Sequence, residues 1–316
     1  MKLHVCSGDL WAGAENQVVT LLTTLQQAGE AVELVVFNPG RLHDEARSRG
    51  IAVSLVAEEN STWLMARQLR KIIQQRSAAL IQTHGYKENL VAWLAQFGLG
   101  VPMVTTLHGG AEFAATGRQR LVQWFNSMLI RYKMRFLVAV SGALAGECER
   151  RWPGKVVQIN NFALASRIRQ GALEALPGNI DKQLAGARKE GVLIGMVGRL
   201  VPLKRHDLAI EIVALLRHKF KVPASLLIVG EGPERQRLES KAATDGVAAA
   251  VYFTGECANP YPLLTAFDCL LICSDHEGVP MVMLEAMALG CPLVAHNVGG
   301  MREALKDSGV AKLVDQ

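Results

Sequence analysis

Short apolar runs alternate with amphipathic stretches of helical length through the first half of the chain. The runs are apolar on both faces, as strands buried in a parallel sheet are, and they cover residues 3–6, 32–37, 52–56, 79–83, 103–107, 136–140 and 156–159. The stretches between them predict helices over residues 15–28, 62–75, 87–97, 118–132 and 142–150. This alternation predicts a doubly wound α/β domain.

The second half resumes the same pattern after a polar segment. Residues 166–190 contain Pro177-Gly178 and have no strand pattern, so we expect a linker there. The next strands are predicted at 192–197, 225–229, 251–254, 269–273, 292–295 and 311–314, and the helices at 206–218, 234–243, 261–266, 282–289 and 301–305. The pattern predicts two facing Rossmann-like domains, 1–165 and 191–316, with ligands at the carboxyl ends of their strands.

Composition narrows the class of protein. Half of the 316 residues are hydrophobic and 20% are charged, which is typical of a globular protein. No apolar run reaches membrane-spanning length, and no nucleic-acid-binding motif occurs. The six cysteines are scattered without a C-x-x-C pair, which favours reduced thiols and a cytoplasmic location.

The net charge of +5 is concentrated in the first half. Residues 1–165 hold 17 basic and 12 acidic residues, whereas residues 166–316 hold 17 of each. Apolar residues are interleaved with a basic cluster formed by Arg118, Arg120, Arg131, Lys133 and Arg135. The commoner explanation is a helix with a core-facing apolar stripe and solvated charges. The alternative is a helix on an anionic membrane, which would place the protein peripherally on the inner membrane face.

Two carboxylates, Glu277 and Glu285, stand eight residues apart across the predicted start of a helix. A buried strand precedes them, and Pro280 suits the first helical turn. Backbone N–H groups at such a helix start favour an anionic ligand group. Carboxylates beside an anion site need another partner, and sugar or ribose hydroxyls are the natural candidates.

Two further loops follow strands of the second half. In Gly198–Lys204 the cations Arg199 and Lys204 can converge on a diphosphate, although an exposed loop with ordinary surface charges explains the same residues. The turn Gly230-Glu231-Gly232-Pro233 is only weakly specific.

In the first half, Trp11–Glu15 follows the first strand and opens a helix, as a substrate loop does. His84 and His108 each follow a strand and precede a glycine, so they are candidates for ligand contact or for structural roles. Ser141 suits a helix N-cap.

Several motifs are missing from the sequence. There is no D-x-D metal clamp, no P-loop, no G-x-G-x-x-G after the first strand and no G-x-S-x-G elbow. These absences weaken the interpretations as a metal-dependent nucleotide site, a P-loop protein, a dinucleotide enzyme or a serine hydrolase.

The constellation resembles the family 4 retaining glycosyltransferases of the GT-B fold, the glycosyl transferases of group 1. The resemblance spans nearly the whole chain and is carried by Gly13-Ala14-Glu15, His108-Gly109, Ser141, Gly198-Arg199 with Lys204, Gly230-Glu231-Gly232-Pro233, Glu277 with Glu285, and Gly299-Gly300 with Glu303. The segment from Glu277 through Glu285 to Ala286-Met287-Ala288-Leu289-Gly290 is the most specific part.

The resemblance implies a nucleotide-diphosphate sugar on the second domain, without a metal or another cofactor. It implies catalytic roles for His108, Glu277, Arg199 and Lys204, with Glu285 on the ribose. Further donor contacts are implied at Gly13, Gly198, Glu231, Gly278, Val279, Pro280 and Met281. The acceptor would bind the first domain, near Glu15, His84, His108 and Ser141.

Two departures from the family pattern accompany the resemblance. Ala12 replaces the first glycine of a usual pair, and the chain stops at Gln316, where the family continues into a further helical segment. We therefore expect a transferase acting on a glycan or lipid-linked acceptor in cell-envelope polysaccharide or lipopolysaccharide synthesis. The alternatives are a sugar-nucleotide-binding or regulatory protein without turnover and a GT-B sugar-nucleotide epimerase.

Overall fold

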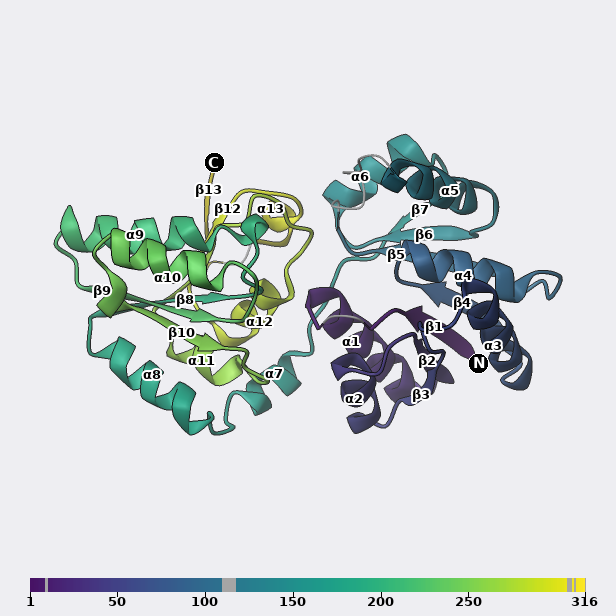
Figure 1. Cartoon of the computed structure of the whole chain (residues 1–316), viewed down its shortest axis with the longest axis horizontal. Helices are drawn as coiled ribbons and strands as arrows, with labels where there is room; N and C mark the ends of the chain where they lie inside the picture. Colours follow the sequence, from purple (N-terminus) through teal and green to yellow (C-terminus); the bar gives the residue numbers. More distant parts are fainter. Residues whose placement is uncertain (9–10, 110–117, 306–308, 310, 316) are drawn as a thin grey trace. The chain divides into compact units, whose positions relative to one another are not determined.

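The computed structural model describes the chain apart from residues 9–10, 110–117, 306–308, 310 and 316, and it divides into two compact units, Met1–Asn161 and Phe162–Gln316 (Figure 1). Both units are α/β structures around a parallel sheet, as the hydrophobic pattern predicts. No helix in the described part is long and apolar enough to cross a membrane.

The first unit is built on a seven-stranded parallel sheet in the order β3-β2-β1-β4-β5-β6-β7. Its strands are β1 (Lys2–Cys6), β2 (Val32–Val36), β3 (Ala52–Leu55), β4 (Leu80–Thr83), β5 (Met103–Leu107), β6 (Phe136–Ala139) and β7 (Val156–Gln158). Its helices are α1 (Gly13–Gln27), α2 (Arg41–Ser48), α3 (Thr62–Gln75), α4 (Tyr86–Gln96), α5 (Arg118–Tyr132) and α6 (Gly142–Arg151). One core lies under α1 and α2, and another lies under α3, α4 and α6.

The second unit has a six-stranded parallel sheet in the order β10-β9-β8-β11-β12-β13. Its strands are β8 (Val192–Val197), β9 (Ala224–Val229), β10 (Val251–Gly255), β11 (Cys269–Ile272), β12 (Leu293–His296) and β13 (Ala311–Val314). Its longer helices are α7 (Ala165–Gly171), α8 (Gly178–Arg188), α9 (His206–His218), α10 (Arg235–Thr244), α11 (Tyr261–Ala266), α12 (Met281–Leu289) and α13 (Met301–Leu305), and its short 3₁₀ turns are η2 (Pro202–Lys204) and η3 (Ala248–Ala250). Helices α9 and α10 cover one sheet face, and α8, α11, α12 and α13 cover the other (Figure 1).

The two sheets share one strand order around their first strands. In each, the chain moves outward from the first strand through two neighbours and then crosses to the opposite side, to β4 in one unit and to β11 in the other. The crevice at such a switch point is where open α/β sheets bind ligands. The fold therefore directs attention to the loops after β1 and β4 and to those after β8 and β11.

The predicted linker over 166–190 is wrong. This segment holds α7 and α8, which belong to the second unit. Ile180 and Ala187 of α8 are buried, and the partly buried Leu184 packs against the same core. These apolar residues recur at helical spacing, but they form only a narrow stripe within a polar segment. So narrow a stripe does not predict a helix from the sequence.

Helix α2 was not predicted. Only Leu42 and Ala46 of its residues are buried, four positions apart, so its apolar signal is a single i,i+4 pair. The remaining helices and strands start and end within a few residues of the predicted bounds.

Candidate functional site

The loops after β8 and β11 meet at the switch point of the second unit. The Asp275 N–H donates to the Leu203 carbonyl at 3.0 Å, which joins the two loops through their backbones. Lys204 pairs with the Glu277 carboxylate, and the Ser274 hydroxyl donates to the same oxygen, Oε1, at 2.6 Å. The structure thus brings together Lys204 and Glu277, which the sequence placed 73 residues apart.

Glu277 is held in a defined orientation by these two donors. Its side chain is only 11% exposed, and its second oxygen, Oε2, makes no hydrogen bond to any described residue. Oε2 is therefore an oriented acceptor for a ligand hydroxyl.

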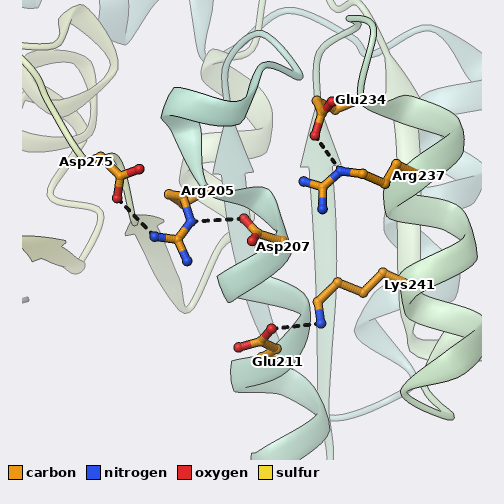
Figure 2. Close-up of polar contacts among 7 residues, drawn as sticks. All are labelled: Arg205, Asp207, Glu211, Glu234, Arg237, Lys241 and Asp275. Carbon is orange, nitrogen blue, oxygen red and sulfur yellow. Dashed lines mark hydrogen bonds and ion pairs between the residues drawn. The ribbon is translucent and has the colours of Figure 1, made fainter.

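The three cations of the loop after β8 differ in how far their charge is neutralised. Lys204 has one carboxylate partner, whereas Arg205 has two: Asp275 at 3.0 Å and Asp207 at 3.2 Å (Figure 2). Arg199 is exposed and has no ion-pair partner in the described part of the chain. Arg199 is therefore the cation with most of its charge left for an anionic ligand.

Sequence reasoning missed Arg205 and Asp275. The hydrogen bond to Asp275, followed by the charge of Asp207, raises the pKa of Arg205 above its ordinary value. Arg205 also has a left-handed backbone, with φ 53° and ψ 44°, which is uncommon for a residue other than glycine. Figure 2 shows its guanidinium lying between the two carboxylates, so it ties the two loops together.

Glycines allow the surrounding turns to approach closely. A Cβ on Gly230 would lie 2.1 Å from the Gly198 carbonyl oxygen, and a Cβ on Gly299 would lie 1.7 Å from the Glu277 carbonyl oxygen. The turn after β9 therefore supports the loop that carries Arg199, and Gly299 supports the loop that carries Glu277. Next to Gly230, Glu231 is exposed and pairs with Arg235 at 2.8 Å.

Helix α12 begins at Met281, with Pro280 as its N-cap rather than inside its first turn. No acidic residue lies in that first turn, so the N-terminal N–H groups next to Gly278 and Val279 keep their positive character. Glu285 lies within the helix and is buried.

Cys273 directly follows β11 below this loop. Burial raises the pKa of its thiol to about 12. Cys273 therefore stays protonated at neutral pH and is not a nucleophile.

The switch point of the first unit carries different chemistry. His84 and His108 follow β4 and β5, and His84 Nδ1 lies 3.0 Å from His108 Nε2. His4, inside β1, contacts His84 in turn. Sequence reasoning also missed His4. A polar residue in an otherwise apolar strand could have pointed to it.

The other predicted residues of the first unit lie at helix starts. Gly13 is the first residue of α1, and the Glu15 carboxylate accepts the Ala12 N–H at 3.0 Å. Ser141 is buried and caps α6 by accepting the Leu144 N–H at 3.3 Å, as its position predicted. A second unpredicted contact ties the residue after β1 to α4: the Glu88 carboxylate accepts from both the N–H and the hydroxyl of Ser7, at 2.7 and 2.6 Å.

Two family models match the chain, one in each unit. The glycosyltransferase family 4 model covers residues 11–163, and the model for glycosyl transferases of group 1 covers residues 179–316. The chain belongs to the family 4 glycosyltransferases of the GT-B fold.

Among similar curated proteins are D-inositol 3-phosphate glycosyltransferases. Those of Salinispora arenicola and Thermomonospora curvata are 31% and 29% identical over 75% of this chain. The chain covers 57% and 59% of their lengths, respectively. The putative glycosyltransferase EpsF of Bacillus subtilis is 23% identical over 92% of this chain and 78% of its own length.

Solved structures share the fold. HepE of Anabaena in complex with UDP-glucose superimposes with a TM-score of 0.84 at 20% identity, covering 99% of this chain and 85% of that one. WaaG, a glycosyltransferase involved in lipopolysaccharide biosynthesis, superimposes with a TM-score of 0.73 at 16% identity, covering 100% of this chain and 86% of that one. At these identities the likeness establishes the GT-B architecture.

Proposed function

We propose that the chain is a retaining, metal-independent glycosyltransferase that moves a sugar from a nucleotide-diphosphate sugar to a glycan or lipid-linked acceptor, in cell-envelope polysaccharide or lipopolysaccharide synthesis. The observation that carries this proposal is the shared oxygen of Glu277, which binds Lys204 and Ser274; the loop that carries Lys204 also carries Arg199, a cation with no ion-pair partner among the described residues. Cations and an oriented carboxylate at one switch point suit a ligand with both a diphosphate and hydroxyl groups.

Each residue has a role that follows from its surroundings. Arg199 and Lys204 stabilise the diphosphate as it leaves and gains charge, which is electrostatic catalysis without a metal ion. Glu277 Oε2 accepts from a hydroxyl of the donor sugar, and Glu285 binds the ribose. The first-turn N–H groups of α12 face the phosphates.

In this proposal the first unit binds the acceptor through residues after its strands. His108 contacts the sugar near its reacting carbon, and His84, Glu15 and Ser141 lie on the acceptor side. Gly13, at the start of α1, lets the backbone approach the donor closely. Retention of the anomeric configuration rests on family membership.

The test is a panel of UDP-, GDP- and ADP-sugars, each with and without EDTA, read by thermal shift, hydrolysis and transfer. UDP-glucose comes first because HepE, which shares the fold, binds it. We expect one donor to stabilise the protein and to be slowly hydrolysed in EDTA. Stabilisation without hydrolysis or transfer would identify a binding or regulatory protein, an isomerised donor an epimerase, and activity lost in EDTA would refute metal independence.

We further propose that α5 places the first unit on an anionic membrane. Leu129 and Ile130 of this helix are buried in the core, so the helix does have a core-facing apolar side. A second apolar surface is nevertheless exposed, formed by Leu121, Val122, Trp124, Phe125, Met128 and Tyr132. Trp124 is 59% exposed and Leu121 is 70% exposed.

Basic residues border this apolar surface. Arg120, Arg131, Lys133 and Arg135 are exposed, and the helix has no acidic residue; the side chain of Arg118 lies outside the described residues. Apolar side chains beside exposed basic residues complement the interface of an anionic bilayer. A lipid-linked acceptor would bring the enzyme to that surface.

Vesicle co-sedimentation tests this membrane proposal. Wild-type protein is expected to bind phosphatidylglycerol vesicles at low salt, to bind phosphatidylcholine less, and to dissociate as salt rises. Replacing Arg131, Lys133 and Arg135 by Gln is expected to abolish binding. A control that removes the same charge from Arg167, Lys182 and Lys189, exposed in the second unit, should bind normally. Equal binding by both triple variants would refute the role of α5.

A further inference from the structure

Three histidines lie in or directly after neighbouring strands of the first sheet, on one face. His4 lies in β1 opposite Gln82 of β4, and His84 is two residues beyond Gln82. β4 in turn pairs Gln82 with Val104 of β5, and His108 lies four residues beyond Val104. Side chains alternate faces along a strand, so each two-residue step keeps the next imidazole on the same face.

The rings form a stacked column linked nitrogen to nitrogen. His4 Nδ1 lies 3.3 Å from His84 Nε2, and His84 Nδ1 lies 3.0 Å from His108 Nε2. Ring centroids are 5.6 and 5.3 Å apart, with interplanar angles of 20° and 30°. The central ring, His84, therefore uses both of its nitrogens within the column.

The column is uncharged near neutral pH. Burial lowers the pKa of His4 and His108 to about 4, with Lys2 adding to the effect on His4. Burial and the two neighbouring imidazoles lower the pKa of His84 well below its ordinary value. A neutral imidazole has one donor and one acceptor nitrogen, so the column has only two consistent hydrogen-bonding arrangements, one the reverse of the other.

The column ends at His108. His4 is buried and His84 and His108 are half-buried, so the column runs from the core outward. His108 Nδ1 is enclosed but has no hydrogen-bond partner among the described residues. The Glu88 carboxylate, four residues after His84 in the sequence, accepts from Ser7. The free nitrogen suits a ligand group that can donate or accept, and a sugar hydroxyl does both.

We propose that His84 and His4 are positioning residues for His108: the column couples the tautomer of His108 to those of His84 and His4, so that all three change together or not at all, and it orients Nδ1 toward a hydroxyl of the sugar substrate. The substrate in this proposal rests on the proposed transferase function, whereas the column itself does not. Both residues act through His108 and touch no reacting atom.

The decisive measurement is the tautomer of His108 in the ligand-free full chain, read at pH 7.5 from imidazole ¹H–¹⁵N correlation spectra after ¹⁵N-histidine labelling. The His108 signals are assigned by their loss in His108→Asn. We expect one neutral tautomer in the wild type and a mixture of both in His84→Phe, which keeps the ring and removes both nitrogens. The exposed His218 gives a control, His218→Gln, which should leave the His108 signals unchanged.

Two further variants separate positioning from folding. His84→Asn keeps a polar atom near the Nδ1 position, next to His108, whereas His84→Gln keeps one near the Nε2 position, next to His4. We expect His84→Asn to retain a single His108 tautomer and His84→Gln to lose it. An unchanged His108 tautomer in both His84→Phe and His84→Gln would overturn the proposal, and His84→Gln still decides it if His84→Phe does not fold.

Kinetics supply an independent readout. We expect His84→Phe to lower kcat about tenfold with little change in the KM of the donor, because orientation is lost while binding is kept. His84→Asn should recover most of that loss. If all the His84 variants had the kcat of the wild type, the proposal would also be overturned. A wild-type protein that shows the single tautomer but transfers no sugar would refute the transferase function and leave the column intact.

Discussion

The two sheets have the same strand order around their first strands, but the side chains gathered at the ends of those strands differ in chemistry. In β1 and directly after β4 and β5, the first unit brings neutral, partly enclosed imidazoles together. After β8 and β11, the second unit brings together cations and carboxylates. One architecture therefore supports both a nearly uncharged site suited to hydroxyl groups and a charged site suited to phosphate.

Each unit also uses one charged side chain to connect the segments that follow its two switch-point strands. In the first unit, buried Glu88 holds Ser7 through two short hydrogen bonds. In the second unit, Arg205 holds Asp275 in a pair that is 36% and 45% exposed. The connecting contact is therefore buried in the first unit and exposed in the second.

Replacing Lys204 by Ala should have the largest effect. It removes a cation proposed to contact the diphosphate and also leaves the Glu277 carboxylate with one donor fewer, so we expect kcat/KM for transfer to fall about 10²–10³-fold. Steady-state kinetics with the identified donor measure this. The exposed Lys182 provides the control, Lys182→Ala, and near-wild-type transfer by Lys204→Ala would remove Lys204 from the site.

Acid should destabilise the first unit more than the second. The pKa of His4 and His108 is about 4 when folded and near 6.5 when unfolded, so the unfolded chain binds more protons between these values. Stability is complete above pH 6.5 and decreases as pH falls to about 4, by on the order of 3 kcal/mol for each group. The second unit holds one comparable group, His206, whose pKa burial also lowers to about 4.

Hydrogen exchange on the intact chain distinguishes the units. After correction for intrinsic rates, amides of β1, β4 and β5 should lose more protection between pH 7 and pH 5 than those of β8, β9 and β11. Equal losses would mean that the imidazole column is not what makes the first unit acid-sensitive.

Glu88→Gln should cost the first unit about 1–3 kcal/mol of unfolding free energy, because the two buried charge-assisted hydrogen bonds from Ser7 become bonds to a neutral amide oxygen. Urea unfolding at low and high salt measures this. The cost should be nearly independent of salt, since the contact is buried. A cost that disappears at high salt would show that the contact behaves as a surface ion pair.

Arg205→Ala should have the smallest effect on stability, below about 1 kcal/mol, because exposed ion pairs contribute little and are screened by salt. Arg205→Gly removes the same ion pairs but suits the left-handed backbone, so it should be no less stable than Arg205→Ala. Urea unfolding of both variants tests this. If Arg205→Gly is clearly less stable, the backbone conformation at this position is not a source of strain.

The hydrophobic pattern determined the fold class, because strands buried on both faces need unbroken apolar runs and the helices need a periodic stripe. It also placed Glu277, Lys204 and His108 in segments that follow strands, and such segments share one edge of a parallel sheet. The pattern failed at α8 and α2, where a few apolar side chains suffice for packing in a polar stretch.

Only the tertiary structure decided which of these residues meet. His4, His84 and His108 stack because β1, β4 and β5 are neighbours in the sheet, and Arg205 reaches Asp275 because β8 lies beside β11. Strand order is a property of the whole sheet, set by how crossovers pack on both faces. Local periodicity does not encode strand order. The sequence by itself therefore determined the elements and the candidate residues, and the fold determined their partners.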